Sequence, residues 1–339
     1  MKINAVTDSE NSPSGWYRIG VLKELFLQSG IDINYIIPKM SNFPPVEKLK
    51  RPAWFLAALA ERISYISKLR GADVTILQRE LISTLPTVER LLPGKVILDV
   101  DDAIFLHKRG YAAINAAKAS IGVVCGNSYL ADYFSKYNKN IEIIPTGVNV
   151  SEMKVLPDRL NSDGKKIIGW LGTAGNLAFF EPIIPDLIAL MKEKAGDVEL
   201  RIVTSHASAI PAELRPYCNF VKWYPGIEFV ELPQWSMGLM PLTDTEWAKG
   251  KCSFKMLQYM SAGIPVVVSP VGMNAEVLAK GGIGFGPSSG SEWYSAIKTL
   301  VDNEDLNNKF GKQARFVAEK DFSLEYVVGK WSAAFKSWL

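Results

Sequence analysis

The sequence has few cysteines, only two histidines and no long hydrophobic run. Its three cysteines, Cys125, Cys218 and Cys252, are far apart, odd in number and without metal-ligand spacing. This argues against a disulfide scaffold and favours a reducing cytoplasm. No apolar run approaches the roughly 20 residues that cross a bilayer. Because a strand pattern begins at the N-terminus, no room remains for a secretion signal. We expect a cytoplasmic protein, either soluble or on a membrane surface.

Charge is nearly balanced. The chain has 38 Lys and Arg against 35 Asp and Glu, a net charge of +3. This is too small to indicate a nucleic-acid partner. A hydrophobic share of 48% and a charged share of 22% are ordinary for a globular protein. The length of 339 residues exceeds a comfortable single core and predicts two domains.

Strand and helix patterns alternate twice along the chain, which predicts an α/β fold of parallel sheets with helices on both faces. The polar segment Ser151–Lys165 interrupts this alternation and is the expected linker. We therefore expect two doubly wound, Rossmann-like domains, 1–150 and 151–324, facing a cleft at the carboxyl ends of their strands. The expected strands are Ile3–Thr7, Ile33–Ile37, Val74–Leu77, Val96–Val100, Ile121–Cys125, Ile141–Ile144, Lys166–Leu171, Leu200–Thr204, Phe220–Trp223, Gly238–Met240, Pro265–Ser269 and Ile283–Phe285.

The segment from Glu246 to Glu276 is the most informative. It reads as a polar loop, a helix N-capped by Ser253 and stopped at Gly263, a buried strand, and a glycine turn that opens a second helix at Gly272-Met-Asn-Ala-Glu276. Lys251 and Lys255 stand at the first helix start. Two helix N-termini with two lysines predict an anion site, most naturally for phosphate.

A small-residue turn follows the first strand of each predicted domain. The first is Ser12-Pro-Ser-Gly-Trp-Tyr-Arg18 and the second is Gly169-Trp-Leu-Gly-Thr-Ala-Gly175. Neither is a dinucleotide-binding fingerprint, because each lacks the glycine spacing and the acidic residue that would bind the ribose of the nucleotide. Glycine admits a ligand close to the backbone, so each turn either contacts a sugar or phosphate or is a tight strand-to-helix connection.

Several of these motifs together resemble the glycosyltransferase family 4 group of nucleotide-sugar transferases. The resemblance covers nearly the whole chain and is strongest in the second half. It is carried by Gly238-Leu-Met-Pro-Leu-Thr-Asp-Thr245, Lys251-Cys-Ser-Phe-Lys255-Met-Leu-Gln-Tyr-Met-Ser-Ala-Gly-Ile-Pro-Val-Val267, Gly272-Met-Asn-Ala-Glu276, Ile168-Gly-Trp-Leu-Gly172, Val124-Cys-Gly-Asn-Ser-Tyr-Leu130, Ile144-Pro-Thr-Gly-Val-Asn149 and the tail from Trp293 to Trp338.

The resemblance implies the GT-B architecture, with the donor in the second domain, the acceptor mainly in the first, and a final helix over 325–339 that packs back on the first domain. It implies retaining, hexosyl transfer from a nucleoside-diphosphate sugar without a metal or other cofactor. The residues agree with this implication in one respect, because lysines and helix N-termini can neutralise the charge of a diphosphate without a metal. The residues expected to bind the nucleotide-sugar donor, from the resemblance or from their place next to such residues, are Gly172, Thr173, Trp223, Glu246, Lys251, Ser253, Lys255, Gln258, Gly272, Met273, Asn274 and Glu276.

The sequence departs from the family at two positions. Where relatives have two glutamates with seven residues between them, this chain has Gly250 and Gln258. Gln258 still offers an acceptor and a donor for the ribose hydroxyls, at a cost of about 1 kcal/mol. Gly250 cannot contact the donor sugar, although the nearby Glu246 could take that place. Since the leaving phosphate is thought to act as the base, loss of the first carboxylate does not by itself exclude activity.

On the acceptor side, Asp101 and Asp102 end a first-domain strand. We expect one of them to orient an acceptor hydroxyl; the alternative is a carboxylate that caps the following helix. His107 follows on the same connection and is a candidate contact to donor or acceptor. Gly15, Trp16 and Arg18 of the first turn are candidate acceptor contacts.

A basic and apolar stretch, Glu47–Arg70, carries six basic residues against two acidic ones, interleaved with apolar side chains. It fits contact with an anionic membrane surface and a lipid-linked saccharide acceptor. Its alternative is an ordinary amphipathic helix whose apolar stripe lies in the core. The sequence thus predicts a glycosyltransferase of surface glycan synthesis. The alternatives are a non-catalytic nucleotide-sugar-binding subunit and a nucleotide-sugar epimerase.

Overall fold

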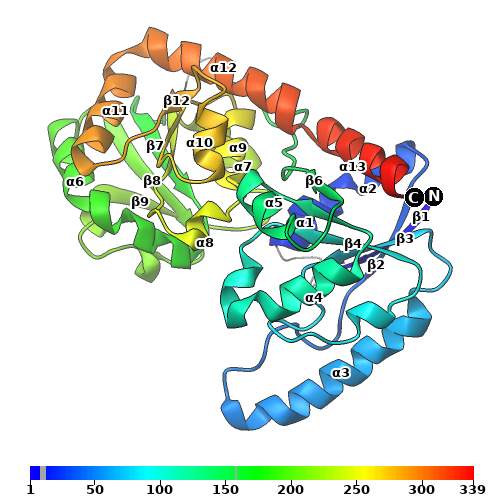
Figure 1. Cartoon of the computed structure of the whole chain (residues 1–339). Coiled ribbons are helices and arrows are strands. Elements are labelled where there is room, and N and C mark those ends of the chain that lie inside the picture. Colours follow the sequence, from blue (N-terminus) through cyan, green and yellow to red (C-terminus); the bar gives the residue numbers. More distant parts are fainter. Residues whose placement is uncertain (8–12, 157–158) are drawn as a thin grey trace. The chain divides into compact units, whose positions relative to one another are not determined.

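The computed structural model describes residues 1–7, 13–156 and 159–339, and these form two compact units (Figure 1). The first unit contains Met1–Gly147, Lys249–Cys252 and Leu324–Leu339, and the second contains Val148–Ala248 and Ser253–Ser323. The first unit therefore includes four residues, Lys249–Cys252, that lie within the span predicted for the second domain.

Each unit is built on a six-stranded sheet in which every pairing is parallel. This confirms the predicted α/β class with two Rossmann-like sheets, and each predicted strand is present within a few residues. The order in the first unit is β2 (Asp32–Ile36), β1 (Lys2–Val6), β3 (Val74–Gln78), β4 (Lys95–Val100), β5 (Gly122–Cys125), β6 (Ile141–Ile143). In the second it is β12 (Gly284–Phe285), β11 (Val266–Val268), β10 (Met237–Met240), β7 (Lys166–Leu171), β8 (Val198–Thr204), β9 (Cys218–Lys222).

The strand order reverses once in each sheet. In the first unit the chain moves outward from β1 to β2 and then returns to the other side of β1 at β3. In the second it moves from β7 to β8 and β9 and then returns beside β7 at β10. Ligands of open α/β sheets bind at the carboxyl ends of the strands where the order reverses. The expected ligand edges are therefore the ends of β1 and β3, and of β7 and β10.

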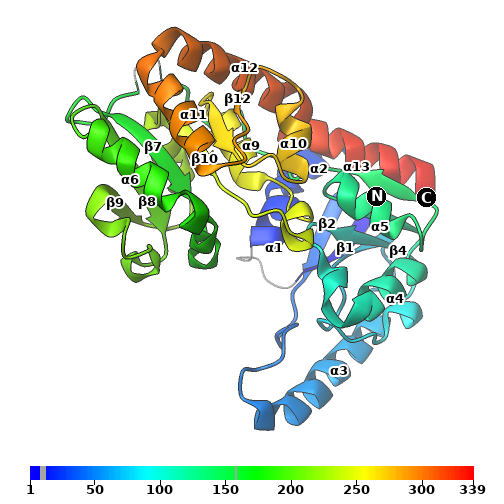
Figure 2. The same cartoon turned by 60° about the vertical axis from the view of Figure 1, so that its left-hand side comes forward.

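Helices fill the connections (Figures 1 and 2). Those of the first unit are α1 (Pro13–Arg18), α2 (Lys23–Gln28), α3 (Arg51–Lys68), preceded by the 3₁₀ turn η2 (Lys48–Lys50), α4 (Tyr111–Ala119), α5 (Ser128–Phe134) and α13 (Leu324–Trp338). Those of the second are α6 (Ile184–Glu193), α7 (Glu228–Glu231), α8 (Glu246–Lys249), α9 (Phe254–Ser261), α10 (Met273–Leu278), α11 (Gly290–Asp302) and α12 (Glu304–Phe322). The last residue of α8 belongs to the first unit by its contacts.

The final helix is part of the first core. Its apolar residues recur at helical spacing, so that one face is buried in the core of the first unit, where it contacts α2. Phe335 packs on Phe26 with ring centroids 6.3 Å apart. The buried residues of this face are Leu324, Val327, Val328, Trp331, Ala334 and Phe335.

The stretch Ala174–Glu193, which is the 3₁₀ segment η5 (Ala174–Ile183) followed by α6, does reach the length and hydropathy of a membrane-spanning helix. The expectation that no apolar run does so was wrong by this measure. Core helices pass the same test, and this stretch contributes Phe180, Leu187 and Leu190 to the second core. It also contains Pro182, Glu181 and Asp186.

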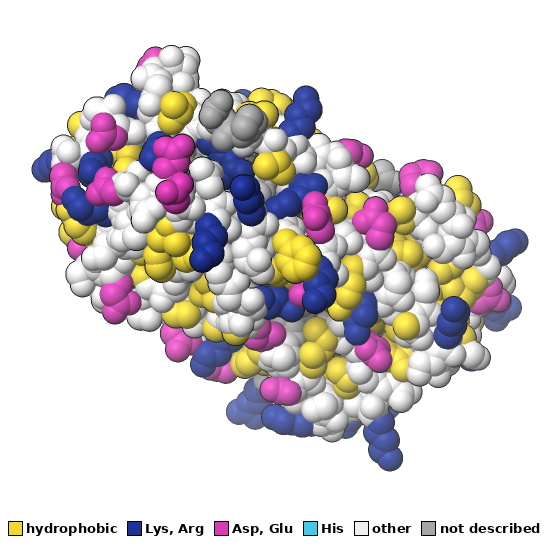
Figure 3. All heavy atoms as spheres, turned by 90° about the horizontal axis from the view of Figure 1, so that it is seen from above, with side chains coloured by type: hydrophobic (Ala, Val, Ile, Leu, Met, Phe, Trp, Pro, Cys, Tyr) yellow, Lys and Arg dark blue, Asp and Glu magenta, His cyan; other side chains and the backbone are white. Residues whose placement is uncertain are grey.

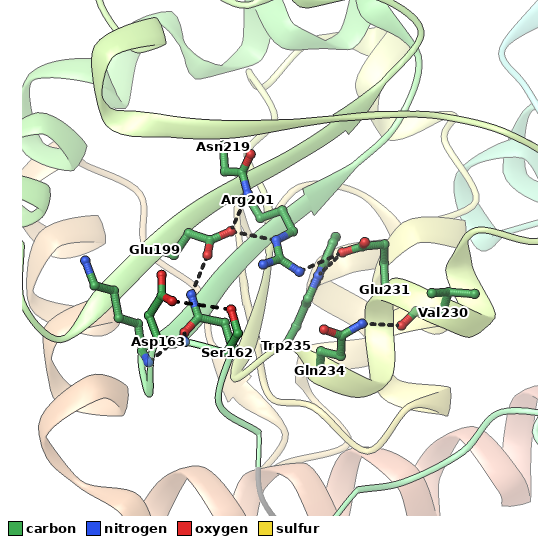
Figure 4. A network of polar contacts seen from close by, with 11 residues as sticks. Ser162, Asp163, Glu199, Arg201, Asn219, Val230, Glu231, Gln234 and Trp235 are labelled. Carbon is green, nitrogen blue, oxygen red and sulfur yellow. Dashed lines mark hydrogen bonds and ion pairs between the residues drawn. The ribbon is translucent and has the colours of Figure 1, made fainter.

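A partly buried ionic network stabilises the second sheet (Figure 4). Arg201 of β8 donates through Nε to Glu199 (2.6 Å) and through Nη1 to Glu231 (3.1 Å). Glu199 also accepts from Asn161 (2.6 Å) and Asn219 (3.1 Å), so the network ties the predicted linker to β8 and β9.

Candidate functional site

The second unit brings Lys255 and Gly172 together at the carboxyl end of β7. A Cβ built on Gly172 would lie 2.4 Å from Cε of Lys255, so the lysine side chain crosses directly over the Gly172 backbone. Lys255 Nζ lies 5.7 Å from the Trp170 ring. These residues come from β7, its following turn and the first turn of α9. Since β7 is the strand at which the order reverses, a cation stands at the expected ligand edge.

Ser253 holds the N-cap position of α9, but its side chain does not cap the helix. Its φ of 50° is left-handed, which is uncommon for a residue with a side chain. Its hydroxyl instead donates to Oδ1 of the fully buried Asn274 (2.6 Å), and Nδ2 of Asn274 donates to the carbonyl of Ser269 (3.0 Å). The predicted N-cap position of Ser253 is therefore confirmed, but its hydroxyl links the start of α9 to α10 instead of capping α9.

Gly272 also precedes α10 with a positive φ (54°), as a turn glycine does. The predicted set of three backbone donors over Gly272–Asn274 is smaller than expected, because the amide of Asn274 already donates to the carbonyl of Val271 (3.2 Å). Met273 is buried, and Glu276 is exposed in the first turn of α10. The predicted contact of this turn with phosphate or sugar stays a prediction for Gly272 and Met273.

The remaining predicted donor residues differ in exposure. Thr173 is exposed beside Gly172, and its hydroxyl accepts from Asn176 (2.9 Å). Trp223 directly follows β9 and is 40% exposed, and Glu246 is exposed at the start of α8. Gln258 is 5% exposed, three residues after Lys255 and thus on the same side of α9.

Lys251 belongs to the first unit, with Lys249–Cys252. Two bonds hold this segment: Nδ2 of Asn127 donates to the carbonyls of Lys249 (3.1 Å) and Lys251 (3.0 Å). Oδ1 of the same side chain accepts from the amide of Leu130 and caps α5. One buried asparagine therefore starts a helix and fixes the segment that carries Lys251.

Two glycines allow the segment Lys249–Cys252 to pack closely against the rest of the first unit. A Cβ on Gly126 would lie 2.1 Å from Sγ of Cys252, and a Cβ on Gly250 would lie 2.6 Å from Cβ of Ala103. The Cys252 thiol donates to the carbonyl of Asp101 (3.1 Å), and burial raises its pKa well above the ordinary value. Cys252 is therefore a buried thiol, and Gly250 fills a place where a carboxylate side chain would not fit.

Arg18, a predicted acceptor contact, is 3% exposed and lies inside the first unit. Its guanidinium pairs with both oxygens of the fully buried Asp99, and Nη1 donates to the carbonyl of Ile144 (2.8 Å). The neighbouring Asp99 raises the pKa of Arg18 although burial alone would lower it. The predicted acceptor contact thus finds no exposed group here, because the pair with Asp99 engages the guanidinium. The sequence did not reveal Asp99 as its partner.

The described part of the first turn places its other candidates as follows. Trp16 is 50% exposed on α1, and Gly15 lies in the same helix. Ser12, with which the predicted turn begins, lies outside the described residues. Trp16 therefore remains the exposed candidate of this turn.

Asp101 follows β4 at its carboxyl end. Its Oδ2 accepts from the hydroxyl of Ser14, whereas its buried Oδ1 has no hydrogen-bond partner among the described residues. Asp101 does not cap the following 3₁₀ segment η4 (Ile104–Gly110), whose N-cap position is held by Ala103. Asp102 is half-buried next to it. A buried carboxylate oxygen without a donor is costly, so a hydroxyl from a ligand is a favourable partner.

His107 is exposed within η4, in a turn where Lys108, Arg109 and Gly110 all have positive φ. Such strain in non-glycine residues costs about 1–3 kcal/mol each and often marks functional loops.

The role of Asn127 in positioning the segment of Lys251 was not predicted from the sequence, which placed this residue only within the Val124–Leu130 motif. Its N-cap position before the apolar residues of α5 could have identified the cap, but not its two long-range bonds.

Comparison with known proteins assigns this architecture. Residues 165–303 match the family described as Glycosyl transferases group 1. "Glucosyltransferase 3" of Streptococcus parasanguinis is 24% identical over 254 residues, covering 70% of this chain and 72% of the relative. Residues 165–303 thus match a group 1 glycosyltransferase domain, which confirms the resemblance at this level; membership of family 4 stays a prediction.

Solved structures are similar over the full chain. HepE from Anabaena, in complex with UDP and glucose, has a TM-score of 0.69 at 13% identity, covering 99% of this chain and 100% of its own. WaaG, a glycosyltransferase involved in lipopolysaccharide biosynthesis, has a TM-score of 0.69 at 12% identity, covering 98% of each chain. At such identities the likeness shows the fold alone, and the fold is GT-B.

Proposed function

We propose that the chain moves a hexosyl group from a nucleoside-diphosphate sugar onto a saccharide or lipid-linked saccharide in surface polysaccharide synthesis. The observation that carries this proposal is Lys255, which crosses Gly172 at the carboxyl end of β7 within the group 1 domain. Relatives named for glucosyl transfer and for lipopolysaccharide synthesis support the reaction class. HepE, seen with UDP and glucose, supports a nucleotide-sugar donor.

On the donor side, Lys255 would bind the diphosphate, and Lys251 would add a second cation. Charge-assisted contacts of lysine to phosphate oxygens become stronger as negative charge develops on the leaving diphosphate. Thr173 would add a hydroxyl and a backbone donor, and Trp223 would lie near the base. Gln258 would hold the ribose hydroxyls.

On the acceptor side, Oδ1 of Asp101 would accept a hydrogen bond from the attacking hydroxyl, because it is buried and has no donor among the described residues. Asp102 and the exposed His107 are further candidate contacts. The acceptor oxygen would bond to the anomeric carbon on the face from which the diphosphate leaves, which retains the anomeric configuration. As the bond between the sugar and the diphosphate breaks, the proton of the attacking hydroxyl would pass to an oxygen of the leaving diphosphate. Lysines replace a metal in this scheme, and activity should therefore survive chelation.

A non-catalytic nucleotide-sugar-binding subunit is the second candidate, and one observation favours it. The place of the first family glutamate is taken by Gly250, which packs on Ala103 and leaves no room for a carboxylate. Such a subunit would bind donor without forming product or free nucleotide. An epimerase would release free nucleotide and an epimerised sugar.

We also propose that the protein is cytoplasmic and touches the inner face of the membrane through α3. One helical stripe of α3 and η2 is apolar and exposed, although the helix buries its opposite face through Ala58, Arg62 and Tyr65. Leu49 is 96% exposed and Leu56 67%. At spacings of three and four the stripe consists of Leu49, Ala53, Leu56, Ala60 and Ile63, and exposed Lys48, Lys50 and Lys68 flank it. The helix thus has two apolar faces, and its exposed one suits an anionic lipid surface.

The experiment that tests the function has two steps. Thermal-shift screening against uridine, guanosine, adenosine and cytidine diphosphates and their sugars identifies the donor. The donor sugar is then incubated with lipid-linked saccharide, with and without EDTA, and products are read by NMR of the anomeric proton. Product with retained configuration, unchanged by EDTA, supports the proposal. Binding without turnover supports the non-catalytic subunit.

A further inference from the structure

A second basic recess occurs in the second unit, away from the carboxyl ends of the strands. Its cavity of about 510 Å³ is lined by residues of the predicted linker, the turn after α9, and α12. Gly263 in that lining precedes the amino end of β11, so the recess opens at the edge of the sheet opposite Lys255. The lining residues are Val155, Leu156, Arg159, Gly263, Asn308, Gly311, Lys312 and Arg315.

The guanidinium of Arg159 rests on two glycines. A Cβ on Gly311 would lie 3.3 Å from Nη1, and a Cβ on Gly263 would lie 3.3 Å from Nη2. The Nε group donates to the carbonyl of Leu156 (3.3 Å), whereas the buried Nη1 has no hydrogen-bond partner among the described residues. The two glycines therefore hold a buried donor at the wall of the recess that the described chain leaves unused.

All charged side chains among the described residues that line the recess are basic. Lys312 is exposed, and Arg315 bonds to Glu319 and to the carbonyl of Val150 (2.6 Å). No Asp or Glu occurs among the described residues that line the recess. Burial lowers the pKa of Arg159 to about 10, and no carboxylate among the described residues offsets this effect. Figure 3, which views the molecule from the side of α12, shows Lys and Arg side chains on this face together with Asp and Glu side chains.

We propose that this recess binds a phosphate-bearing anion through Arg159 and Lys312. The planar guanidinium and the ammonium supply charge-assisted donors that match phosphate oxygens. A recess of this size accepts a small organic phosphate, with Val155 and Leu156 facing its apolar part. The anion would bond to the unused Nη1 group and offset the cost of a buried, unpaired cation.

Phosphate titration tests the proposal. The parent for this test is the Lys255→Ala chain, so that the diphosphate site contributes little. Inorganic phosphate is added in calorimetry and, separately, in thermal unfolding, with sodium chloride at equal ionic strength as the reference. We expect phosphate binding that Arg159→Gln weakens at least tenfold and that Lys312→Gln weakens several-fold. Lys320→Gln, which removes the same charge from the last turn of α12 outside the recess, should bind as the parent does.

A purely structural role for Arg159 gives the opposite thermal result. In phosphate-free buffer, Arg159→Gln should keep or raise the Tm, because it removes an uncompensated buried charge. It should also lose the rise in Tm that phosphate gives the parent. Equal phosphate binding by parent and Arg159→Gln, no binding by the parent, or a lower Tm of Arg159→Gln without phosphate would overturn the proposal. None of these outcomes depends on donor binding or sugar transfer.

Discussion

Gly250 and Ala103 are packed so closely that position 250 has no room for a side chain. A Cβ on Gly250 would lie 2.6 Å from the Cβ and 2.8 Å from the amide nitrogen of Ala103. The departure from the family's first glutamate is thus coupled to the packing of Lys249–Cys252 within the first unit. Glycine at this position is required by a neighbour distant in sequence.

We predict that Gly250→Ala lowers the free energy of unfolding by about 1–3 kcal/mol, the usual cost of overpacking. Gly250→Glu should be worse and should not increase activity. Urea denaturation followed by tryptophan fluorescence measures both variants. Gly196→Ala is the control, because a Cβ there meets nothing within 4 Å. Unchanged stability of Gly250→Glu, with higher transfer activity, would contradict the packing argument.

Asn127 should be more sensitive to charge than other helix caps. Asn127→Asp keeps the oxygen that caps α5, but it places a carboxylate oxygen against the carbonyls of Lys249 and Lys251. We expect a loss of about 2–3 kcal/mol, from two lost bonds and new repulsion. Asn303→Asp is the matched control, since Asn303 caps α12 and Asp caps equally well. Similar losses in both variants, measured by denaturation, would refute the role assigned to Asn127.

The Glu199–Arg201 network predicts how stability depends on acid (Figure 4). Partial burial tends to raise the pKa of Glu199, but the bonds from Arg201, Asn161 and Asn219 outweigh it and lower this pKa. A carboxyl group with a depressed folded-state pKa contributes stability above its unfolded pKa and loses it as pH falls through the folded value. Acidification below about pH 4.5 should therefore destabilise the second unit.

Glu199→Gln should remove this dependence. The variant should lose about 1–3 kcal/mol at neutral pH, and its Tm should fall less steeply than that of the parent between pH 5 and pH 3. Glu304→Gln is the control, because Glu304 is exposed. Parallel Tm curves of parent and Glu199→Gln would show that the network does not contribute as described.

The exposed stripe of α3 predicts a specific loss of membrane binding. Leu49→Glu and Leu56→Glu should each reduce cosedimentation with phosphatidylglycerol vesicles at least fivefold, because each puts a charge into the apolar contact. Val230→Glu is a control on the second unit, where Val230 is 53% exposed. Little binding is expected to pure phosphatidylcholine. Equal binding of all variants, or equal binding to both lipids, would exclude this surface.

The sheets and the lysine site could be predicted from local patterns, whereas the long-range contacts could not. The β-branched run Val266–Val268 predicts a strand and Gly263 predicts the end of a helix, and both signals come from residues adjacent in the sequence. The pairing of Arg18 with Asp99, 81 positions apart, depends on the sheet that brings them together. The same holds for Ser253, whose hydroxyl bonds to Asn274 and not to its own helix. The exposed face of α3 was ambiguous because both of its faces are apolar.

Calorimetry of nucleoside diphosphate binding to parent and Lys255→Ala tests the central claim most directly. The account predicts that the parent binds the diphosphate selected by screening, and that Lys255→Ala binds at least tenfold more weakly, a loss of about 1.4 kcal/mol or more. Lys309→Ala, which removes an exposed lysine from α12, should bind as the parent does. No binding by the parent, or equal binding by Lys255→Ala, would contradict the account.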